Sequence, residues 1–387
     1  TRFKCDWSSD VCSSDLQGVC RSLWAWTNLS GVVYTGVGTN LKFYIEAGGA
    51  YNDITPIRST VTLNNPFTAT ASSATITVAD TAHGCNTGDF VTFSGAVGLG
   101  GNITATVLNQ EYQVTVIDVD TYTFTATATA NATDALGSPG GGASVVAAYQ
   151  LNVGPAVVQP LSGWGAGPWG FGPWGSSSTS ISLRIWNQMN YGQDLVFGPR
   201  GGGIYYWSAS VATPLSVRGV ALNSLGGTVT MTIASPCVVT ASIVLTEGAA
   251  VSFSTTGALP TGITAGTTYY AYQVDGLTFK LLTAAGAVVN TSGTQSGTHS
   301  MTLVDVPTVQ NVLTISDTSR FVFAMGCNDY GSSTLDPMLV RWSNQNDIYN
   351  WTPDATNQAG YVRLSHGSQI ITAIQDRKST RLNSSHT

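Results

Sequence analysis

Short stretches in which apolar and polar residues alternate follow one another along most of this chain, and glycine-rich turns separate them. The segments Gly31–Tyr34 and Leu41–Ile45 are two examples, joined by the turn-forming sequence GVGTN. An alternation of period two places every second side chain on one face of a strand, and glycine supplies the backbone angles of tight turns. The pattern predicts antiparallel β-strands with short connections and an all-β fold.

A tryptophan-rich stretch, residues 163–207, stands out from this pattern. Glycine and proline are unfavourable inside helices, so its GWGAGPWGFGPWG run predicts turns and edges of β-structure. Three short strands are expected after the run, over Ser182–Trp186, Asp194–Phe197 and Gly203–Trp207. The stretch contains five tryptophans that are candidates for binding or assembly: Trp164, Trp169, Trp174, Trp186 and Trp207.

Two segments share one layout of strands, which predicts two copies of a small antiparallel β-module. They cover residues 59–148 and 226–303. The sequence GDFVTFS at 88–94 matches GAAVSFS at 248–254, EYQV at 111–114 matches YYAY at 269–272, and DTYTF at 120–124 matches DGLTF at 275–279. Such self-similarity indicates one structural unit used twice.

The remaining pieces, residues 17–58, 149–225 and 304–375, read as one continuous host domain. The last piece predicts three strands, over Asn311–Ile315, Arg320–Ala324 and Met338–Trp342. Short strands grouped in this way suit the four-stranded blades of a β-propeller. We therefore expect an incomplete β-propeller-like host domain with two inserted small antiparallel β-modules, whose last blade is cut off at Gln375.

The two ends of the chain differ in style from the rest. Residues 1–16, TRFKCDWSSDVCSSDL, and residues 376–387, DRKSTRLNSSHT, resemble translated sequencing-adapter sequence. We interpret both as artefactual or disordered and leave them out of the fold.

Charge narrows the choice of function. Only 9% of residues are charged, against about 25% in ordinary soluble domains. Residues 17–375 contain ten Lys and Arg and seventeen Asp and Glu, and tight nucleic-acid binding needs clustered cations. No apolar run approaches the roughly 20 residues of a membrane helix, so we expect a soluble or assembled protein.

Residues suited to catalysis or metal binding are sparse. The four cysteines of residues 17–375 stand far apart, without metal-ligand spacing, and are expected to be buried or free thiols: Cys20, Cys85, Cys237 and Cys327. The histidines His83, His299 and His366 lie beside predicted turns or strand ends. The acidic pairs Asp118 with Asp120 and Asp329 with Asp336 are candidates for glycosidase-like carboxylates, but in a loop-rich β protein such residues more often belong to turns. We therefore expect no enzymatic activity, no catalytic residues, no metal and no cofactor.

Several separated phrases carry a resemblance to a known family. They are DITPIR at 53–58, the GWGAGPWGFGPWG run, RIWNQMNYGQDLVFGPRGGGIYYW at 184–207, and DPMLVRWSNQNDIYNWTPDATNQAGYVRLSHGSQI at 336–370. Together they resemble the tail nozzle, or tail-tube, proteins of short-tailed bacteriophages, over nearly all of residues 17–375.

The resemblance implies a structural protein of the phage virion, assembled in the host bacterial cytoplasm. It implies a homo-oligomeric ring, of six copies in the family, that builds the tube below the portal and adaptor proteins and lets double-stranded DNA pass without sequence-specific binding. A wall poor in Lys and Arg is what a conduit for a polyanion requires. The candidates for structural or interface contacts are Trp164, Trp169, Trp174, Trp186, Trp207, Trp342 and Trp351.

Carbohydrate binding is the alternative function that the sequence leaves open. Trp164, Trp169 and Trp174 recur every five residues, and exposed aromatic faces stack well on sugars. In that case the protein is a phage or cell-surface adhesin. Solvent-open tryptophan faces favour this reading, whereas rings buried against neighbouring strands favour assembly.

Overall fold

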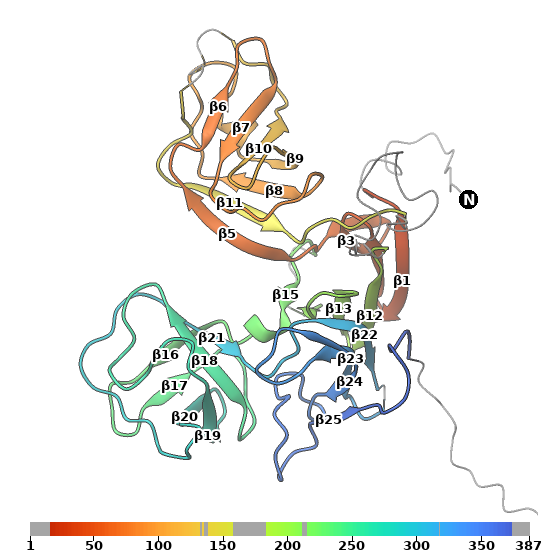
Figure 1. Cartoon of the computed structure of the whole chain (residues 1–387), viewed down its shortest axis with the longest axis vertical. Coiled ribbons are helices and arrows are strands. Elements are labelled where there is room, and N and C mark those ends of the chain that lie inside the picture. The colour runs from red at the N-terminus through yellow and green to blue at the C-terminus, as the bar shows by residue number, and fades with distance from the viewer. Residues whose placement is uncertain are drawn as a thin grey trace, which may run out of the picture. The chain divides into compact units, whose positions relative to one another are not determined.

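The computed structural model describes residues 16–131, 134, 138–157, 183–210, 215–316 and 318–373. Their strands form five antiparallel sheets, which confirms the predicted all-β class (Figure 1). The chain divides into two compact units. Unit 1 is Thr1–Ile185 with Val211–Gly219, unit 2 is Trp186–Ser210 with Val220–Thr387, and each is described by itself.

Unit 1 begins with a four-stranded antiparallel sheet whose strands follow one another in chain order. Its hairpins form where the sequence predicts alternating strands and glycine turns, and Phe43 and Ile45 are fully buried. This order within one small sheet is that of a propeller blade. The strands are β1 (Cys20–Thr27), β2 (Val33–Thr39), β3 (Phe43–Ala47) and β4 (Ala50–Asp53).

The rest of unit 1 is a seven-stranded sheet curled into a half-barrel, which we call the first module. Its strand order is β5-β11-β8-β9-β10-β7-β6. The elements are β5 (Ile57–Leu63), β6 (Phe67–Ala69), β7 (Thr75–Ala79), β8 (Phe90–Ser94), α1 (Ala105–Leu108), β9 (Glu111–Val116), β10 (Thr121–Thr125) and β11 (Val145–Gln150).

The open side of this half-barrel is bridged by a loop just before β11. Phe67 and Gly140 exchange two backbone hydrogen bonds, of 3.0 and 2.8 Å. The next residue, Gly141, has a φ of 106°, and a Cβ there would lie 2.4 Å from the Phe67 ring. Only glycine combines this backbone angle with so close an approach.

Unit 2 contains two further four-stranded sheets with strands in chain order. The first has β12 (Trp186–Tyr191), β13 (Asp194–Pro199), β14 (Tyr205–Trp207) and β15 (Val220–Ala221), followed by η1 (Leu222–Ser224). The second has β22 (Gln310–Ile315), β23 (Val322–Asn328), β24 (Leu335–Trp342) and β25 (Gly360–Arg363).

Two strand predictions in unit 2 need correction. The strand predicted over Ser182–Trp186 lies too early in the chain: of its described residues only Trp186 belongs to β12, which continues to Tyr191 because that residue pairs with Asp194 across a two-residue turn. Gly192 occupies that turn with a φ of 67°, as the tight hairpin requires. The last sheet has a fourth strand, β25, where the sequence predicted three, because its exposed side chains hide the usual alternation.

The second module is a closed six-stranded barrel in unit 2. Its order is β16-β17-β20-β19-β18-β21, and β21 returns to pair with β16. The strands are β16 (Thr228–Met231), β17 (Val238–Thr240), β18 (Ala250–Thr255), β19 (Tyr269–Asp275), β20 (Thr278–Leu282) and β21 (His299–Leu303).

Six strands of the first module and the six of the second follow the same order in their sheets. Reading from β11 gives β11-β8-β9-β10-β7-β6, and reading from β21 gives β21-β18-β19-β20-β17-β16. The hydrogen-bonded edge between β21 and β16 closes the second barrel, and in the first module the corresponding edge is the Phe67–Gly140 bridge. The repeat read from sequence is therefore one backbone layout used twice, although the predicted domain boundaries stay predictions.

The pairing register of β9 and β19 corrects the sequence match of residues 111–114 with 269–272 by one residue. Val91 pairs with Tyr112 in the first module, and its equivalent Val251 pairs with Tyr269 in the second. Tyr112 therefore corresponds to Tyr269, whereas the sequence match placed Glu111 there. A shift of one residue moves every side chain to the other face of a strand, and an all-aromatic YYAY segment does not reveal which tyrosines point inward.

The structural equivalence of β10 and β20 differs by two residues from the sequence match of 120–124 with 275–279. Val114 pairs with Phe124, while Ala271 pairs with Leu281, so Phe124 corresponds to Leu281 and not to Phe279. A shift of two keeps the same face inward, which is why both matches look alike in sequence.

The buried apolar residues form two separate clusters. One lies wholly within the first module, between Phe67 and Tyr149. The other joins the second module to the sheets β12–β15 and β22–β25 in one continuous core, with members from Val196 to Trp351. Unit 2 is thus built around a shared core, whereas the first module has a core of its own.

Candidate functional site

The tryptophans predicted as assembly or binding residues fall into two groups. Trp164, Trp169 and Trp174 lie outside the described residues. Trp186 and Trp207 lie in the β12–β15 sheet and are 4% and 2% exposed. The Trp186 ring lies next to that of Phe197, with 6.1 Å between the ring centroids.

Trp351 and Trp342 lie near the last sheet of unit 2. Trp351 is 1% exposed and belongs to the shared core, and its Nε1 donates to the carbonyl of Ile348 at 2.9 Å. Trp342 is half-buried on β24, and its Nε1 donates to the carbonyl of Gln358 at 2.8 Å. A role for these residues in subunit contacts stays a prediction.

The candidate histidines take part in local hydrogen bonds. In the first module, His83 Nδ1 accepts from the backbone N–H of Cys85 at 3.0 Å, and its Nε2 lies 3.0 Å from the carbonyl of Asp118. A carbonyl only accepts, so Nε2 is the donor in this contact. In the second module, His299 contacts Thr255 Oγ1 at 2.8 Å and Gln295 Oε1 at 3.1 Å. His366 is exposed and bonded to Ser365.

The acidic pairs serve as turn acceptors. Asp118 Oδ1 accepts from the backbone N–H of Asp120 at 2.9 Å, and Asp120 Oδ1 accepts from Ala82 at 2.9 Å. Asp329 accepts from Tyr330 and Asp336 from Met338, at 2.8 and 3.0 Å.

The four described cysteines are free thiols. Burial raises the pKa of Cys85 to about 11 and that of Cys327 to about 12. A nucleophilic cysteine needs a lowered pKa, so these thiols behave as small apolar side chains. In the described part of the chain, no group of three or more His, Cys, Asp or Glu side chains is arranged to hold a metal ion.

A network of four charged side chains joins the first module to the β1–β4 sheet. Lys42, which is 4% exposed, bonds to Asp53 at 3.0 Å and to Glu111. Arg218 bonds to the same two carboxylates, to Asp53 at 2.6 Å and to Glu111 at 3.2 Å. Each carboxylate therefore meets two cations. Gln150 also donates to Glu111.

This network brings together three segments that are far apart in the sequence. Lys42 directly precedes β3 and Asp53 ends β4, Glu111 begins β9, and Arg218 lies in the segment before β15. Burial by itself raises the pKa of Asp53, but Arg218, Lys42 and two hydrogen bonds from Thr55 outweigh it, so that pKa lies below its ordinary value.

The sequence analysis missed this network. The available signal is that Lys42 interrupts an apolar strand in a chain with very few charges, where a buried cation needs an anionic partner. Which of the seventeen acidic residues supply the partners depends on contacts between distant segments.

A second group of buried polar residues lies in the core of the first module. Tyr149 donates to Asp80, and the Tyr122 and Tyr149 hydroxyls are 2.9 Å apart. Arg58 stacks over the Tyr149 ring at 5.0 Å and donates to the carbonyl of His83 at 2.8 Å. Burial raises the pKa of both tyrosines, so their hydroxyls stay protonated and act as donors.

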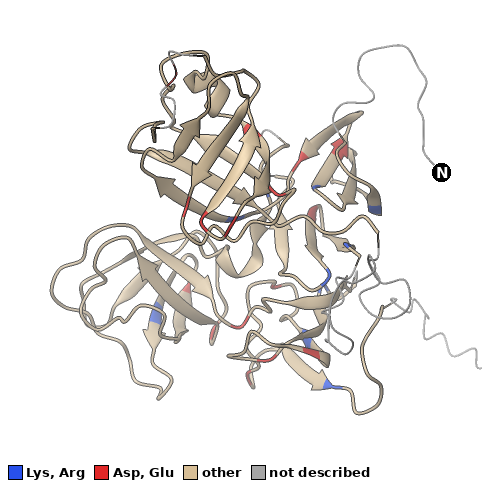
Figure 2. Cartoon of the chain, turned by 45° about the horizontal axis from the view of Figure 1, so that its top comes forward, with Lys and Arg blue, Asp and Glu red and all other residues tan. Residues whose placement is uncertain are grey.

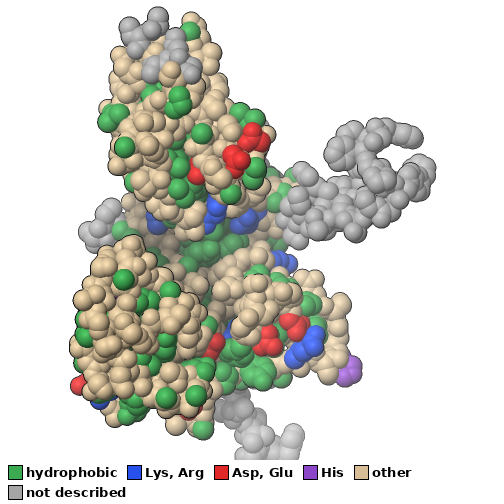
Figure 3. Space-filling view, turned by 60° about the vertical axis from the view of Figure 1, so that its left-hand side comes forward, with side chains coloured by type: hydrophobic (Ala, Val, Ile, Leu, Met, Phe, Trp, Pro, Cys, Tyr) green, Lys and Arg blue, Asp and Glu red, His purple; other side chains and the backbone are tan. Residues whose placement is uncertain are grey.

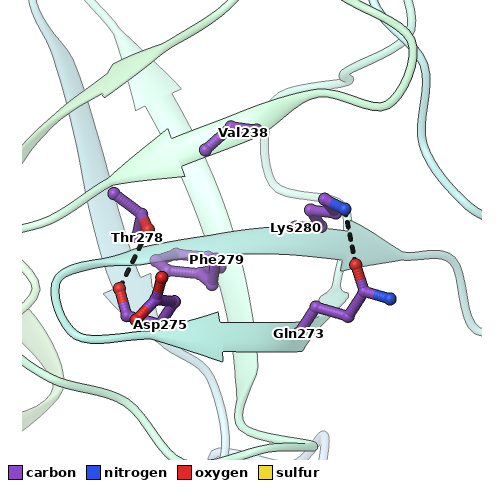
Figure 4. A pocket seen from close by; sticks show the side chains of 6 residues that line it. All are labelled: Val238, Gln273, Asp275, Thr278, Phe279 and Lys280. Atoms are coloured by element: carbon purple, nitrogen blue, oxygen red, sulfur yellow. Dashed lines mark hydrogen bonds between the residues drawn. The ribbon is translucent and has the colours of Figure 1, made fainter.

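The second module carries a shallow pocket of about 290 Å³ on its outer surface (Figure 4). In Figure 4 the side chains of Gln273 and Lys280 point toward each other from neighbouring strands, and Asp275 and Thr278 lie at the turn between those strands. The residues that line it are Val238, Gln273, Asp275, Thr278, Phe279 and Lys280.

Comparisons with known proteins include a distant structural likeness. No family model and no curated protein matches the sequence. Among solved structures, the chain is similar to the phage phi92 endosialidase, with 13% sequence identity and a TM-score of 0.20. The match covers 88% of this chain, which spans 46% of the length of that protein.

Charged residues are few on the described chain, and several of them lie in small groups that contain both signs (Figures 2 and 3). All ten Lys and Arg of residues 17–375 lie in the described part, and each has a partner within its own unit. Lys42, Arg218 and Arg363 pair with carboxylates, and Arg58, Arg184 and Arg341 donate to backbone carbonyls. The other four contact a carbonyl, an amide or a ring: Arg21 with Ala156, Arg200 with Ile371, Lys280 with Gln273 and Arg320 with Tyr191.

Among the described residues, no helix has the length and apolar character needed to cross a membrane.

Proposed function

We propose that this chain is a structural subunit of a short phage tail and forms part of the oligomeric tube through which DNA leaves the capsid. In this proposal identical copies close into a ring, of six subunits as in the nozzle proteins that the sequence resembles. The ring contacts portal, adaptor and other tail proteins in the virion.

The observation that carries the proposal is the way in which the few cations are held. A conduit for DNA must not bind the phosphates that pass through it, and cations that already have intramolecular partners are poorly placed to collect them. Nine of the ten Lys and Arg of residues 17–375 are held by a carboxylate, a backbone carbonyl or an aromatic ring, and Lys280 is held by the neutral amide of Gln273.

Two further features support it. Three four-stranded sheets with strands in chain order match the units of a propeller-like subunit. The low share of charged residues suits large subunit interfaces, whose cores are depleted in charge.

Negative-stain microscopy of the purified full-length chain, with light scattering on the same sample, tests the proposal. We expect closed rings with a central channel, and no retention of double-stranded DNA in gel-shift assays at low salt. The variant Trp342→Ala alters a half-buried interface candidate, and we expect it to weaken the rings while the subunit stays folded. A chain that remains monomeric at every concentration, or that binds DNA tightly, overturns the proposal.

A further inference from the structure

The outer faces of the two modules differ at equivalent positions. On the first module, Thr115 pairs with Thr123, and Thr123 pairs with Thr77, so threonines cover this part of the sheet. Threonine is an ordinary residue for the solvent-facing side of a strand, where packing makes few demands. The first module thus shows that this strand layout folds with threonine at these outward positions.

The second module carries different chemistry on the same three strands. The register places Tyr272 where the first module has Thr115, Lys280 where it has Thr123, and Val238 where it has Thr77. Tyr272 lies directly opposite Lys280. The inward neighbours Tyr269 and Ala271 are buried, so Tyr270 and Tyr272 face outward. The barrel fold does not require this change.

A β-bulge shapes the edge of this surface. Between the Tyr272–Lys280 and Asp275–Thr278 pairs, β19 has two residues where β20 has one. Gln273, the first bulge residue, has a φ of 47°, which is unfavourable for a residue with a Cβ. The Glu247 carboxylate holds the bulge by accepting the backbone N–H groups of Gln273 and Val274, at 3.2 and 2.8 Å.

The bulge directs Gln273 across the sheet to Lys280 (Figure 4). Bulges commonly re-aim a side chain next to a functional site. The partner of the Lys280 ammonium is a neutral amide oxygen, so its charge is not cancelled. At the other end of the pocket Asp275 carries a carboxylate, and its backbone carbonyl accepts from the Thr278 hydroxyl at 2.9 Å.

We propose that this surface binds a carbohydrate that carries a carboxylate, with the sugar ring on Tyr272, the carboxylate at Lys280 and hydroxyl groups at Gln273 and Asp275. An aromatic ring offers a flat apolar face to the C–H side of a sugar. The single Lys280 ammonium matches the single charge of a carboxylate, and the Asp275 carboxylate at the other end of the pocket accepts hydrogen bonds from hydroxyl groups. Tyr272 does not line the pocket itself but lies opposite its lining residue Lys280, and the pocket volume of about 290 Å³ suits a single sugar unit of a chain.

Isothermal titration calorimetry of the full-length chain with oligogalacturonate tests this proposal, with an uncharged malto-oligosaccharide of equal length for comparison. We expect binding of the acidic oligosaccharide and a clear preference for it. The variants Lys280→Thr and Tyr272→Thr copy the first module, which folds with threonine at both positions. Each should weaken binding about tenfold or more, because a hydrogen bond to a charged group or a stacked ring is lost.

The matched control is Thr123→Ala, at the position in the first module that corresponds to Lys280, and it should leave binding unchanged. Thermal melting of every variant checks that the fold is kept. No binding by the unaltered chain, equal binding of both oligosaccharides, or unchanged binding by Lys280→Thr overturns the proposal. Ring formation is read from a separate measurement, so failure of the tail-tube proposal does not decide this one.

Discussion

The first and second modules run through six strands in the same order, yet they join the rest of their units by different means. The first has its own apolar core and meets the β1–β4 sheet through Lys42, Asp53, Glu111 and Arg218. The second shares one apolar core with the two neighbouring sheets. One module is held by charges and the other by burial of apolar surface.

Local contacts of the second module support this contrast. The turn that contains Trp351 lies against the start of β18, where Thr246 contacts Asp347 at 3.0 Å and the backbone N–H of Ala250 donates to Thr352 at 3.3 Å. These bonds surround a fully buried indole. The shared strand layout thus leaves open how each module is attached to its neighbours.

The largest expected effect comes from removing Trp351. Trp351→Ala should lower the free energy of unfolding by about 4 kcal/mol, because truncating a buried tryptophan leaves a cavity. Guanidinium denaturation followed by fluorescence measures it, and Trp342→Ala, which truncates a half-buried ring, should have a clearly smaller effect. A loss below about 1 kcal/mol, as for a surface change, contradicts the shared core.

A somewhat smaller loss is expected from Lys42→Met in the first unit. Removing one partner from a buried ion-pair network leaves the carboxylates under-compensated, and about 3 kcal/mol should be lost. Lys280→Met is the control on the second module, where the change should stay within about 0.5 kcal/mol. Similar effects of the two variants on denaturation would show that the charges do not hold the first module.

The buried polar groups of the first module give a third comparison. Tyr149→Phe removes the hydroxyl that donates to Asp80 and should cost about 2 kcal/mol in denaturation experiments. The triple variant Asp80→Ala, Tyr122→Phe and Tyr149→Leu copies the second module, which has Ala241, Phe279 and Leu303 at these positions.

Because the triple variant leaves none of these polar groups without its partner, it should recover most of the stability lost in Tyr149→Phe. A triple variant that is less stable than the single one would show that the polar cluster is needed for the fold of this module.

The smallest effect is a difference in acid sensitivity. The pKa of Asp53 is lowered in the folded state, so its contribution to stability is present above its ordinary value of 3.8 and is lost as the pH falls below that value. Urea denaturation between about pH 6 and pH 3 should show this loss, and Asp53→Asn should reduce it. If stability falls with pH in the same way in Asp53→Asn as in the unaltered chain, Asp53 does not cause the acid sensitivity.

Much of the fold was predictable because strands and tight turns depend on residues that are close together in the sequence. The hairpins at Gly31–Tyr34 and Leu41–Ile45 and the duplicated module follow from alternation and turn residues. The register of the repeat was not predictable, since a YYAY segment has aromatic side chains on both faces. β25 was missed because it is an exposed edge strand.

The candidate sites depend still more on the tertiary structure. Nothing in the sequence pairs Lys42 with Glu111, because the two residues meet only after two sheets have formed. The outward position of Tyr272 next to Lys280 likewise needs the register of β19 and β20.

The sequence by itself determined the all-β class, the duplication and the scarcity of charge, since each depends on composition or on side-chain periods within a few residues. Only the tertiary structure decided how each module is attached, which polar groups are buried together, and which face of the second barrel carries its tyrosine, lysine and bulge. The physical reason is that burial and strand pairing depend on contacts between distant segments. The alternation within one strand shows only which of its residues share a face, and not what that face contacts.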